Sequence, residues 1–372
     1  MKFVKVSAAA AVGALLLLGA APVGADEGSV IDVGGVPLGV ATDSAGTVYV
    51  SNYGLSGGIQ VLRQGAREPS RTISTGRYPS SLAAAPDGTL YVLQGGPGGM
   101  EIGVIAKDAD AVTKTIPVSP GEHRLTVGPD GSLYVVNPSE RTLSVILPRG
   151  TSVDRNIPVG SGASQVAVAE DGTAFVTNQY AGTVSVIPPG AVRAARTIGV
   201  GATANPHGIA TGPDGTLYVV IIKRDEVAVI EPGATTVARS VWVGHGPQEV
   251  AVAPDGTAYV TNSADQTLSI IPPGAAEATR TVATGKDPGR LAVTPDGTVI
   301  VANRASAALT VLAPAATGSD AASPTAVPSS PASAQAAGAP EGQGPPWLAA
   351  AFGAAGLVLA GTLATFWRRH RS

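Results

Sequence analysis

Short stretches in which apolar and polar residues alternate recur along most of this chain. Residues 257–261 (Thr-Ala-Tyr-Val-Thr) and 267–271 (Thr-Leu-Ser-Ile-Ile) are two examples. Alternation with a period of two is typical of β-strands, and no helical period persists for more than a few residues. An Asp-Gly pair precedes many of these stretches, and that pair is the strongest short-range signal for a β-hairpin. The pattern therefore predicts an all-β body built from hairpins.

The hairpin turns recur at a nearly constant interval, which indicates internal repeats. Successive turn glycines lie 41 to 43 residues apart along the chain: Gly46, Gly88, Gly131, Gly172, Gly215, Gly256 and Gly297. Around Gly256 the pattern predicts four strands, A to D, over residues 249–253, 257–261, 267–271 and 280–284. A four-stranded unit of this length is typical of a propeller blade. A two-sheet sandwich is the alternative, but it would not repeat seven times in register. We expect a seven-bladed β-propeller over residues 28–312.

The two ends of the repeat region predict how the ring closes. Residues 30–34 (Val-Ile-Asp-Val-Gly) match a strand D such as residues 156–160, yet they precede the first strand A. The last repeat ends near Leu312 with no strand D of its own. We therefore expect the N-terminal strand to complete the last blade. Pro117 and Pro158 fall within strand D, which suits the outer edge of a blade because proline cannot donate a ladder hydrogen bond.

The segments outside the repeats predict secretion and a membrane anchor. Lys2 and Lys5 precede an apolar run and small residues, so residues 1–25 resemble a signal peptide, with an uncleaved anchor as the alternative. Residues 313–346 are rich in Ala, Pro and Ser and predict a disordered stalk. Residues 347–367 are apolar and long enough for a transmembrane helix, and the basic tail, residues 368–372, predicts a cytoplasmic end. We expect a single-pass protein of the cell membrane with an extracellular propeller.

Composition narrows the function classes. The chain has no cysteine, so neither a disulfide framework nor a cysteine nucleophile is available. Its formal net charge is −3, which disfavours nonspecific nucleic-acid binding. The scattered Ser and His residues give no triad spacing either, so nucleophilic catalysis has little support.

Two strand-B sequences carry a family resemblance. Tyr-Val-Thr-Asn at residues 259–262 and Phe-Val-Thr-Asn at residues 175–178 each follow Asp-Gly. They resemble the YVTN-type propeller repeat, which is similar to the NHL and streptogramin lyase-like families. The resemblance covers the whole repeat region and implies a propeller. It also implies that ligands meet the face formed by the loops from strand D to strand A and from strand B to strand C.

Several chemistry-bearing residues fall in the loops of that face. The candidate ligand-binding residues are Glu122, His123, Arg124, His207, His245, Gln248, Glu249 and Arg290. His123, His207, His245 and Glu249 are the candidate ligands of a divalent metal, since imidazole and carboxylate suit such ions. Acid–base chemistry by a histidine is a second possibility. Three solvated loop histidines are the plain alternative.

Three further features of the B-to-C loops stand out in the sequence. Residues 94–100 form a longer, Gly-rich B-to-C loop, and residues 221–226 place four charges in another. The Asn that ends strand B in five repeats is expected to cap its turn through its own side chain.

We expect a membrane-anchored extracellular binding or scaffolding module that engages a ligand, a glycan or a protein. No cofactor motif is evident. The alternative is a metal-dependent lyase or lactone hydrolase resembling streptogramin lyase, and residues 205–209 (Asn-Pro-His-Gly-Ile) resemble part of such a site. The Trp-Phe-Thr-Glu strand of that group is Tyr-Val-x-Asn here, so we favour binding over catalysis.

Overall fold

The computed structural model describes residues 28–54, 57–119 and 123–314. The chain divides into two compact units, residues 1–317 and 318–372, and every described residue belongs to the first. The predicted signal peptide, transmembrane helix and tail therefore lie outside the described residues, as does the stalk after Pro314. Within the described ranges no helix is long and apolar enough to cross a membrane.

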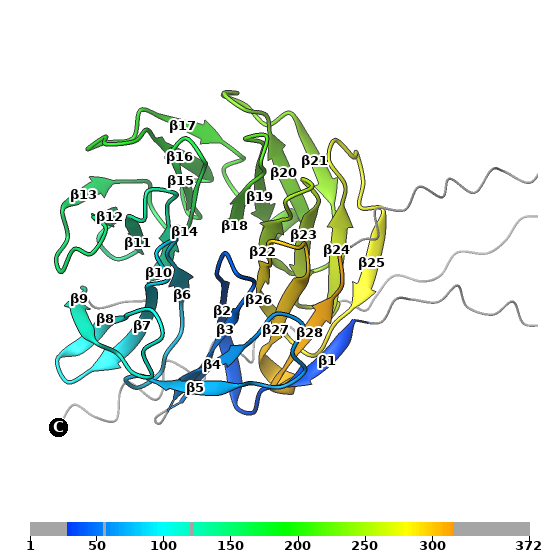
Figure 1. The fold of residues 1–372 in the computed structure, drawn as a ribbon. Helices are drawn as coiled ribbons and strands as arrows, with labels where there is room; N and C mark the ends of the chain where they lie inside the picture. Colours follow the sequence, from blue (N-terminus) through cyan, green and yellow to red (C-terminus); the bar gives the residue numbers. More distant parts are fainter. Residues whose placement is uncertain (1–27, 55–56, 120–122, 315–372) are drawn as a thin grey trace, which may run out of the picture. The chain divides into compact units, whose positions relative to one another are not determined.

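Seven four-stranded antiparallel sheets form the ring, as the repeats predict. Figure 1 shows the first strand of each sheet near the centre and the last at the rim. Blades 1 to 3 contain β2 (Val36–Thr42), β3 (Val48–Tyr53), β4 (Gly58–Leu62) and β5 (Arg71–Ser74); β6 (Leu82–Ala84), β7 (Leu90–Gly96), β8 (Gly99–Ile105) and β9 (Lys114–Pro117); and β10 (Arg124–Val127), β11 (Leu133–Asn137), β12 (Thr142–Ile146) and β13 (Arg155–Pro158).

Blades 4 to 6 repeat the same order. Two single 3₁₀ turns follow strand B in blades 5 and 7: η1 (Ile222–Arg224) and η2 (Arg304–Ser306). Blades 4 to 6 contain β14 (Ala163–Val168), β15 (Ala174–Asn178), β16 (Thr183–Ile187) and β17 (Arg196–Gly199); β18 (Pro206–Thr211), β19 (Leu217–Ile221), β20 (Glu226–Ile230) and β21 (Arg239–Trp242); and β22 (Pro247–Val252), β23 (Ala258–Asn262), β24 (Thr267–Ile271) and β25 (Arg280–Ala283).

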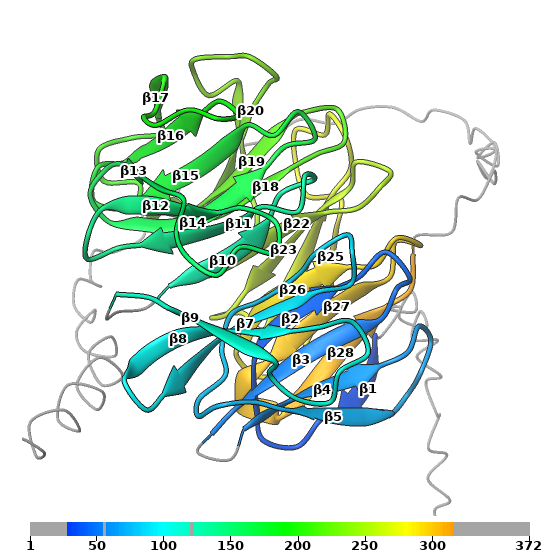
Figure 2. The ribbon, with the colours of Figure 1, turned by 60° about the vertical axis from the view of Figure 1, so that its left-hand side comes forward.

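Blade 7 joins the two ends of the ring, and this confirms the closure prediction. It contains β26 (Pro288–Val293), β27 (Val299–Asn303), β28 (Ala308–Leu312) and, from the N-terminal side, β1 (Ser29–Asp32). Ser29 pairs with Val311 and Asp32 with Ala308, so β1 runs antiparallel to β28 along its full length. The blue and orange strands lie side by side in Figures 1 and 2. Across the seam, Gln64 of blade 1 donates to Asp296 of blade 7 over 2.6 Å.

The A-to-B turns show why the repeat needs its Asp-Gly pair. Each turn glycine has a positive φ, from +77° at Gly46 to +87° at Gly88, which favours a residue without Cβ. The preceding aspartate accepts a hydrogen bond from the backbone two residues later, as Asp87 does from Thr89 at 3.0 Å. In blade 1, where Ala45 replaces that aspartate, Asp43 accepts from Ala45 and Thr47 instead. Local chemistry thus sets the A-to-B hairpin of each blade.

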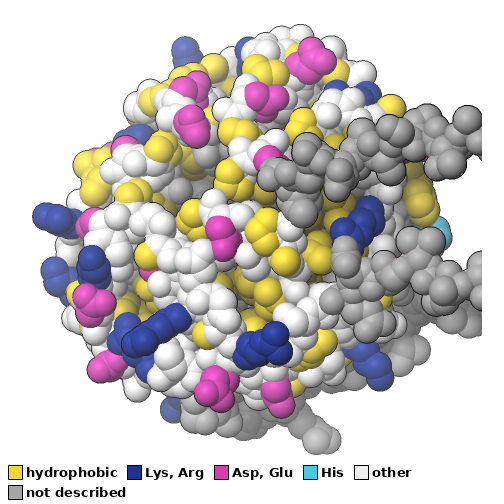
Figure 3. Space-filling view, turned by 45° about the vertical axis from the view of Figure 1, so that its right-hand side comes forward, with side chains coloured by type: hydrophobic (Ala, Val, Ile, Leu, Met, Phe, Trp, Pro, Cys, Tyr) yellow, Lys and Arg dark blue, Asp and Glu magenta, His cyan; other side chains and the backbone are white. Residues whose placement is uncertain are grey.

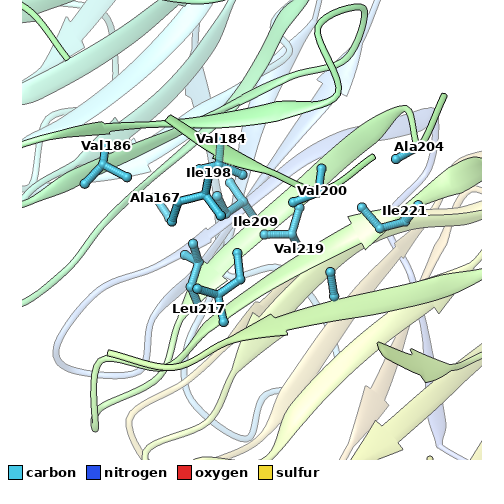
Figure 4. Packing of buried hydrophobic residues seen from close by; sticks show 12 residues of the cluster. Ala167, Val184, Val186, Ile198, Val200, Ala204, Ile209, Leu217, Val219 and Ile221 are labelled. Carbon is cyan, nitrogen blue, oxygen red and sulfur yellow. The ribbon is translucent and has the colours of Figure 1, made fainter. Parts of the chain in front are cut away.

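The core lies between blades rather than inside each one. Figure 4 shows one such cluster, in which Ala167, Val184 and Ile198 of blade 4 face Ile209 and Leu217 of blade 5. The outer strands contribute little, since β13 buries Ile157 alone of its four residues. The same strand holds Pro158, and β9 holds Pro117, so both prolines lie in outer strands as predicted.

Two loop expectations were wrong in detail. The Gly-rich segment after Leu93 is not an open loop, because β7 and β8 extend through it and Gly96 pairs with Gly99 across a Pro97-Gly98 turn. The asparagines at the end of strand B do not cap their own turns. Asn262, for example, donates through Nδ2 to the hydroxyls of Thr267 and Ser269 at 3.1 and 2.9 Å, and so ties strand B to strand C.

Candidate functional site

Five polar side chains from five blades lie near the starts of the innermost strands, on the face of the D-to-A loops, and three of them, Gln165, Glu249 and Arg290, contact one another. We call them the axial cluster: Arg124, Gln165, His207, Glu249 and Arg290. All five lie within the first three residues of an innermost strand, which is where a propeller brings its blades closest together. The cluster therefore depends on the closed ring and not on any single repeat.

A buried carboxylate holds the middle of the axial cluster. Glu249 Oε1 accepts a hydrogen bond from Gln165 Nε2 at 2.8 Å and lies 3.3 Å from Arg290 Nε. Arg290 Nη1 in turn donates to Gln165 Oε1 at 3.4 Å. The glutamate is 9 % exposed, so its negative charge requires these partners. The three residues come from blades 4, 6 and 7, and they link opposite sides of the ring.

His207 is held in one neutral form beside this network. Its Nδ1 lies 2.9 Å from the backbone oxygen of Gln248. A carbonyl oxygen only accepts, so Nδ1 carries the hydrogen. Burial lowers the pKa of His207, and the Arg290 and Arg124 charges add to this, against opposing effects of Glu249 and of the Gln248 hydrogen bond. The ring is therefore neutral at pH 7, and its Nε2 keeps a lone pair that has no hydrogen-bond partner among the described residues.

The Nδ1 bond of His207 also has a structural counterpart in other blades. In blades 1, 4 and 6 a strand-B hydroxyl ties one blade to the next, as Thr177 does to the backbone oxygen of His207 at 2.8 Å and Thr261 to that of Gly289 at 2.9 Å. Blade 5 has Val220 at this position, which cannot donate. The imidazole replaces the missing hydroxyl, so Nδ1 stabilises the ring while Nε2 remains available for chemistry.

His123 lies apart from the axis in a closed backbone pocket. It is 1 % exposed. Nδ1 lies 3.1 Å from the backbone oxygen of Val136, and Nε2 lies 2.5 Å from that of Ser119. Both ring nitrogens therefore face backbone acceptors, and neither presents a lone pair to a metal. Glu122, the acidic candidate beside it, lies outside the described residues.

His245 lies on the surface at the rim of the same face. Its Nδ1 bonds Asp225 Oδ2 at 2.8 Å, and its backbone N–H donates to Asp265 Oδ2 at 2.7 Å. The Asp225 hydrogen bond, followed by the Asp265 charge, raises the pKa of this imidazole. Its ring meets Trp242 edge to face at 6.1 Å between centroids. These contacts clamp the loops of blades 5 and 6 together, away from the axial cluster.

The three histidines therefore occupy three environments, and the predicted metal set does not assemble. In the part of the chain that the structure describes, no three His, Asp or Glu side chains are placed to hold a metal ion. His207 and Glu249 both belong to the axial cluster, but so do two positively charged arginines, and Glu249 Oε1 already contacts Arg290. The divalent metal of streptogramin lyase-like enzymes does not fit these residues.

Two other predicted residues, Arg124 and Gln248, also lie on the face of the D-to-A loops. Arg124 donates through Nη1 to the backbone oxygen of His123 at 3.1 Å, and the Gln248 side chain bonds the backbone oxygen of Gly246 at 3.4 Å. Gln165 belongs to the axial cluster but was not among the predicted ligand-binding residues. Its signal in the sequence was its position, seven residues before the turn glycine, which is shared with Arg124, Glu249 and Arg290.

Surface charge does not add a second recognition feature on the side of the propeller seen in Figure 3. Acidic and basic side chains are interspersed there, without a broad area of one sign. Recognition is therefore better sought in the individual polar groups of the axial cluster.

Comparisons with known proteins place the chain in a family. No curated protein sequence matches it. A streptogramin B lyase structure is similar over 76 % of this chain and 96 % of its own, with a TM-score of 0.64 and 15 % identity. A virginiamycin B lyase from Staphylococcus aureus matches 76 % of this chain and 98 % of its own, with a TM-score of 0.62 and 13 % identity.

The fold also occurs in proteins with other names. A hydrazine synthase structure from Kuenenia stuttgartiensis matches 80 % of this chain and 99 % of its own, with a TM-score of 0.62 and 17 % identity. At such identities the likeness shows the fold alone. The model of the virginiamycin B lyase family, however, matches residues 23–311, which is most of the chain. The chain therefore belongs to the virginiamycin B lyase family.

Proposed function

We propose that this protein is an extracellular binding propeller whose axial cluster holds a carbonyl- or carboxylate-bearing ligand with at least one hydrogen-bond donor. The observation that carries the proposal is the convergence of five polar side chains from five blades, one of which, His207, offers an unused acceptor. Guanidinium groups suit carboxylate and carbonyl oxygens, and Nε2 suits an N–H or O–H of the same ligand.

Quinupristin is a suitable probe, because a catalytically inactive virginiamycin B lyase from Staphylococcus aureus has been solved with it. Titration of the full chain in detergent micelles by calorimetry measures its binding. His207→Asn retains a donor for the Gln248 oxygen but removes the acceptor at Nε2, and we expect it to weaken binding about tenfold or more. His245→Asn changes a histidine of the same face outside the cluster and should bind as the wild type does. Absence of binding, or equal loss in both variants, would refute the proposal.

A second candidate, a metal-independent lyase, is favoured by the neutral form of His207. A neutral imidazole whose Nδ1 is anchored is a suitable general base at Nε2. Elimination opens a cyclic substrate without adding water, so the product keeps its mass, whereas hydrolysis adds one water. Chromatography with mass spectrometry of quinupristin incubated with the full chain distinguishes the two reactions. Activity that survives a chelator and disappears in His207→Asn would support the lyase over simple binding.

We also propose that residues 347–367 anchor the chain in a membrane. Ser29 begins β1 beside Val311, near the end of β28, so both ends of the described chain leave the ring on the side opposite the axial cluster. Carbonate extraction of membranes from cells expressing the full chain, compared with a variant that stops at Pro346, tests the anchor. Release of the full chain by carbonate would refute it.

A further inference from the structure

The aromatic side chains of the propeller divide into two groups. Six lie at the third position after a turn glycine and pack in or against the clusters between blades: Tyr49, Tyr91, Tyr134, Phe175, Tyr218 and Tyr259. The other four within the described ranges do not follow the repeat and are 36 % to 81 % exposed: Tyr53, Tyr78, Tyr180 and Trp242. These four lie in or beside the D-to-A and B-to-C loops. The first group is structural, whereas the second needs another explanation.

Two of the exposed tyrosines form a pair at the seam between blades 1 and 2. Tyr53 ends β3, and Tyr78 lies in the loop from β5 to β6; their ring centroids are 5.1 Å apart and their planes are tilted by 36°. Two residues before each tyrosine on β3 and two after it in the loop, Ser51 Oγ donates to the backbone oxygen of Ser80 at 2.6 Å. Val36, which is 40 % exposed, pairs with Tyr53 from β2, so the two side chains share one face of the sheet. We call Val36, Tyr53 and Tyr78 the blade-1 platform.

Tyr78 holds a backbone conformation that a tyrosine rarely adopts, with φ of +55°. The tenth position before the turn glycine is also left-handed in the loops that lead into blades 4 to 7, where it is occupied by Gly162, Asn205, Gly246 and Asp287. Those residue types tolerate this region, whereas a bulky side chain is strained in it. The N–H of Tyr78 donates to the Gly54 oxygen at 2.8 Å, and Arg77 exchanges two hydrogen bonds with Gly95 at 3.0 and 2.7 Å. The fold therefore holds a strained aromatic residue at the surface, and such exceptions cluster at ligand-binding sites.

The size of the blade-1 platform excludes a stable protein interface. Tyr53 and Tyr78 are 45 % and 36 % exposed, which at about 200 Å² per tyrosine side chain gives about 160 Å². A specific protein interface buries about 800 Å² on each partner. The platform is therefore suited to a small molecule, or to one ring of a longer chain.

The chemistry of the platform narrows that ligand further. Its three side chains carry no charge, so charge complementarity favours a neutral ligand. Neither phenol hydroxyl has a hydrogen-bond partner in the part of the chain that the structure describes, so each can both donate and accept. The two rings already contact each other, and they leave no slot between them for a flat aromatic ligand.

We propose that the blade-1 platform binds a pyranose ring of a neutral glycan. A pyranose carries C–H groups on its faces and hydroxyls around its edge. Its C–H groups meet the electron-rich aromatic surface of Tyr53 and Tyr78, while its hydroxyls bond the two phenol oxygens. The site is separate from the axial cluster, because none of its residues belongs to that cluster.

Calorimetric titration of the full chain with neutral trisaccharides tests the proposal. The probes are maltotriose, cellotriose, mannotriose and triacetylchitotriose, and the detergent has no sugar headgroup, because a maltoside would compete for the site. At least one probe should bind with a dissociation constant of about 1 mM or lower, and Tyr53→Ala should weaken it about tenfold or more. Tyr180→Ala removes an exposed tyrosine of the same face outside the platform and should bind as the wild type does. Absence of binding by all the probes at about 10 mM, or equal loss in both variants, would overturn the proposal.

Tyr78→Asn separates binding from a purely structural role. Asn205 adopts the same backbone conformation in blade 5, so the substitution removes the ring and relieves the strain. The melting temperature should stay within about 2 °C of the wild type, while sugar binding falls about tenfold or more. If the pair only seals the seam, the melting temperature will fall by several degrees and sugar binding will not change. Benzyl alcohol is the aromatic control; its binding in place of the trisaccharides would show a site for aromatic ligands and contradict the glycan assignment.

Discussion

The closing strand β1 offers a matched pair of substitutions that measures how strongly the ring is held shut. Ile31 and Val30 are neighbours in a strand with a single pairing partner, yet Ile31 is 5 % exposed and Val30 is 69 % exposed. Ile31 packs in the cluster between blades 7 and 1 with Val48 and Leu309. The two side chains therefore differ in burial while sharing the same backbone ladder.

Ile31→Ala should cost about 2–3 kcal/mol of unfolding free energy. Truncation of a buried isoleucine to alanine costs about 2–5 kcal/mol, and an outer strand relaxes into the space more easily than an inner one. Val30→Ala should stay within about 0.5 kcal/mol of the wild type, since its side chain already lies in water.

Urea unfolding of the full chain, followed by far-ultraviolet circular dichroism, measures both values. Coincident transitions by tryptophan fluorescence are required for a two-state treatment. An Ile31→Ala variant as stable as Val30→Ala would show that β1 is not packed against the ring. The closure described above would then be wrong.

Three further predictions concern the innermost strand of blade 1, the seam between blades 1 and 7, and the axial cluster. Gly39→Ala should lower the free energy of unfolding in urea by about 3 kcal/mol, because its Cβ would lie 1.9 Å from a backbone oxygen. As a control, Gly199→Ala, whose Cβ would have nothing within 4 Å, should stay within about 0.5 kcal/mol of the wild type. Hydrogen bonds from Thr294, Thr298 and Gln64 lower the pKa of Asp296 to about 2 from 3.8, so its stabilisation is present above pH 4 and is lost as the pH falls towards 2. Asp296→Asn should therefore be less stable than the wild type at pH 7 and equal to it near pH 2. The pKa of His207 is lower in the folded chain than in the unfolded chain, so the unfolded chain binds a proton first as the pH falls. The wild type should therefore lose stability below pH 6.5. Urea titrations at pH 7.5 and 5 should show that His207→Asn lacks this part of the acid sensitivity.

The blade pattern could be predicted from the sequence because hairpins are set by neighbouring residues. The turn glycines at positive φ and the aspartates that bond the backbone two residues later act within one turn. Ring closure could be predicted by counting strands. The chain begins with an extra strand D and the last repeat lacks one, so the first strand can complete the last blade. The asparagines ending strand B show the limit of local reasoning. Their partners are hydroxyls on strand C, such as Ser269, which become neighbours only once the strands pair.

The site was decided by the tertiary structure. His123, His207 and His245 occupy similar loops in the sequence, yet one is enclosed by backbone oxygens, one joins the axial cluster and one lies at the rim. The difference comes from neighbouring blades, which supply the Gln248 carbonyl to His207 and the Asp225 carboxylate to His245. Gln165 and Arg290 meet because the ring brings residues 125 positions apart to one axis. A repeat therefore specifies a blade through local contacts, but the protonation and partners of its loop residues depend on what the closed ring places opposite them.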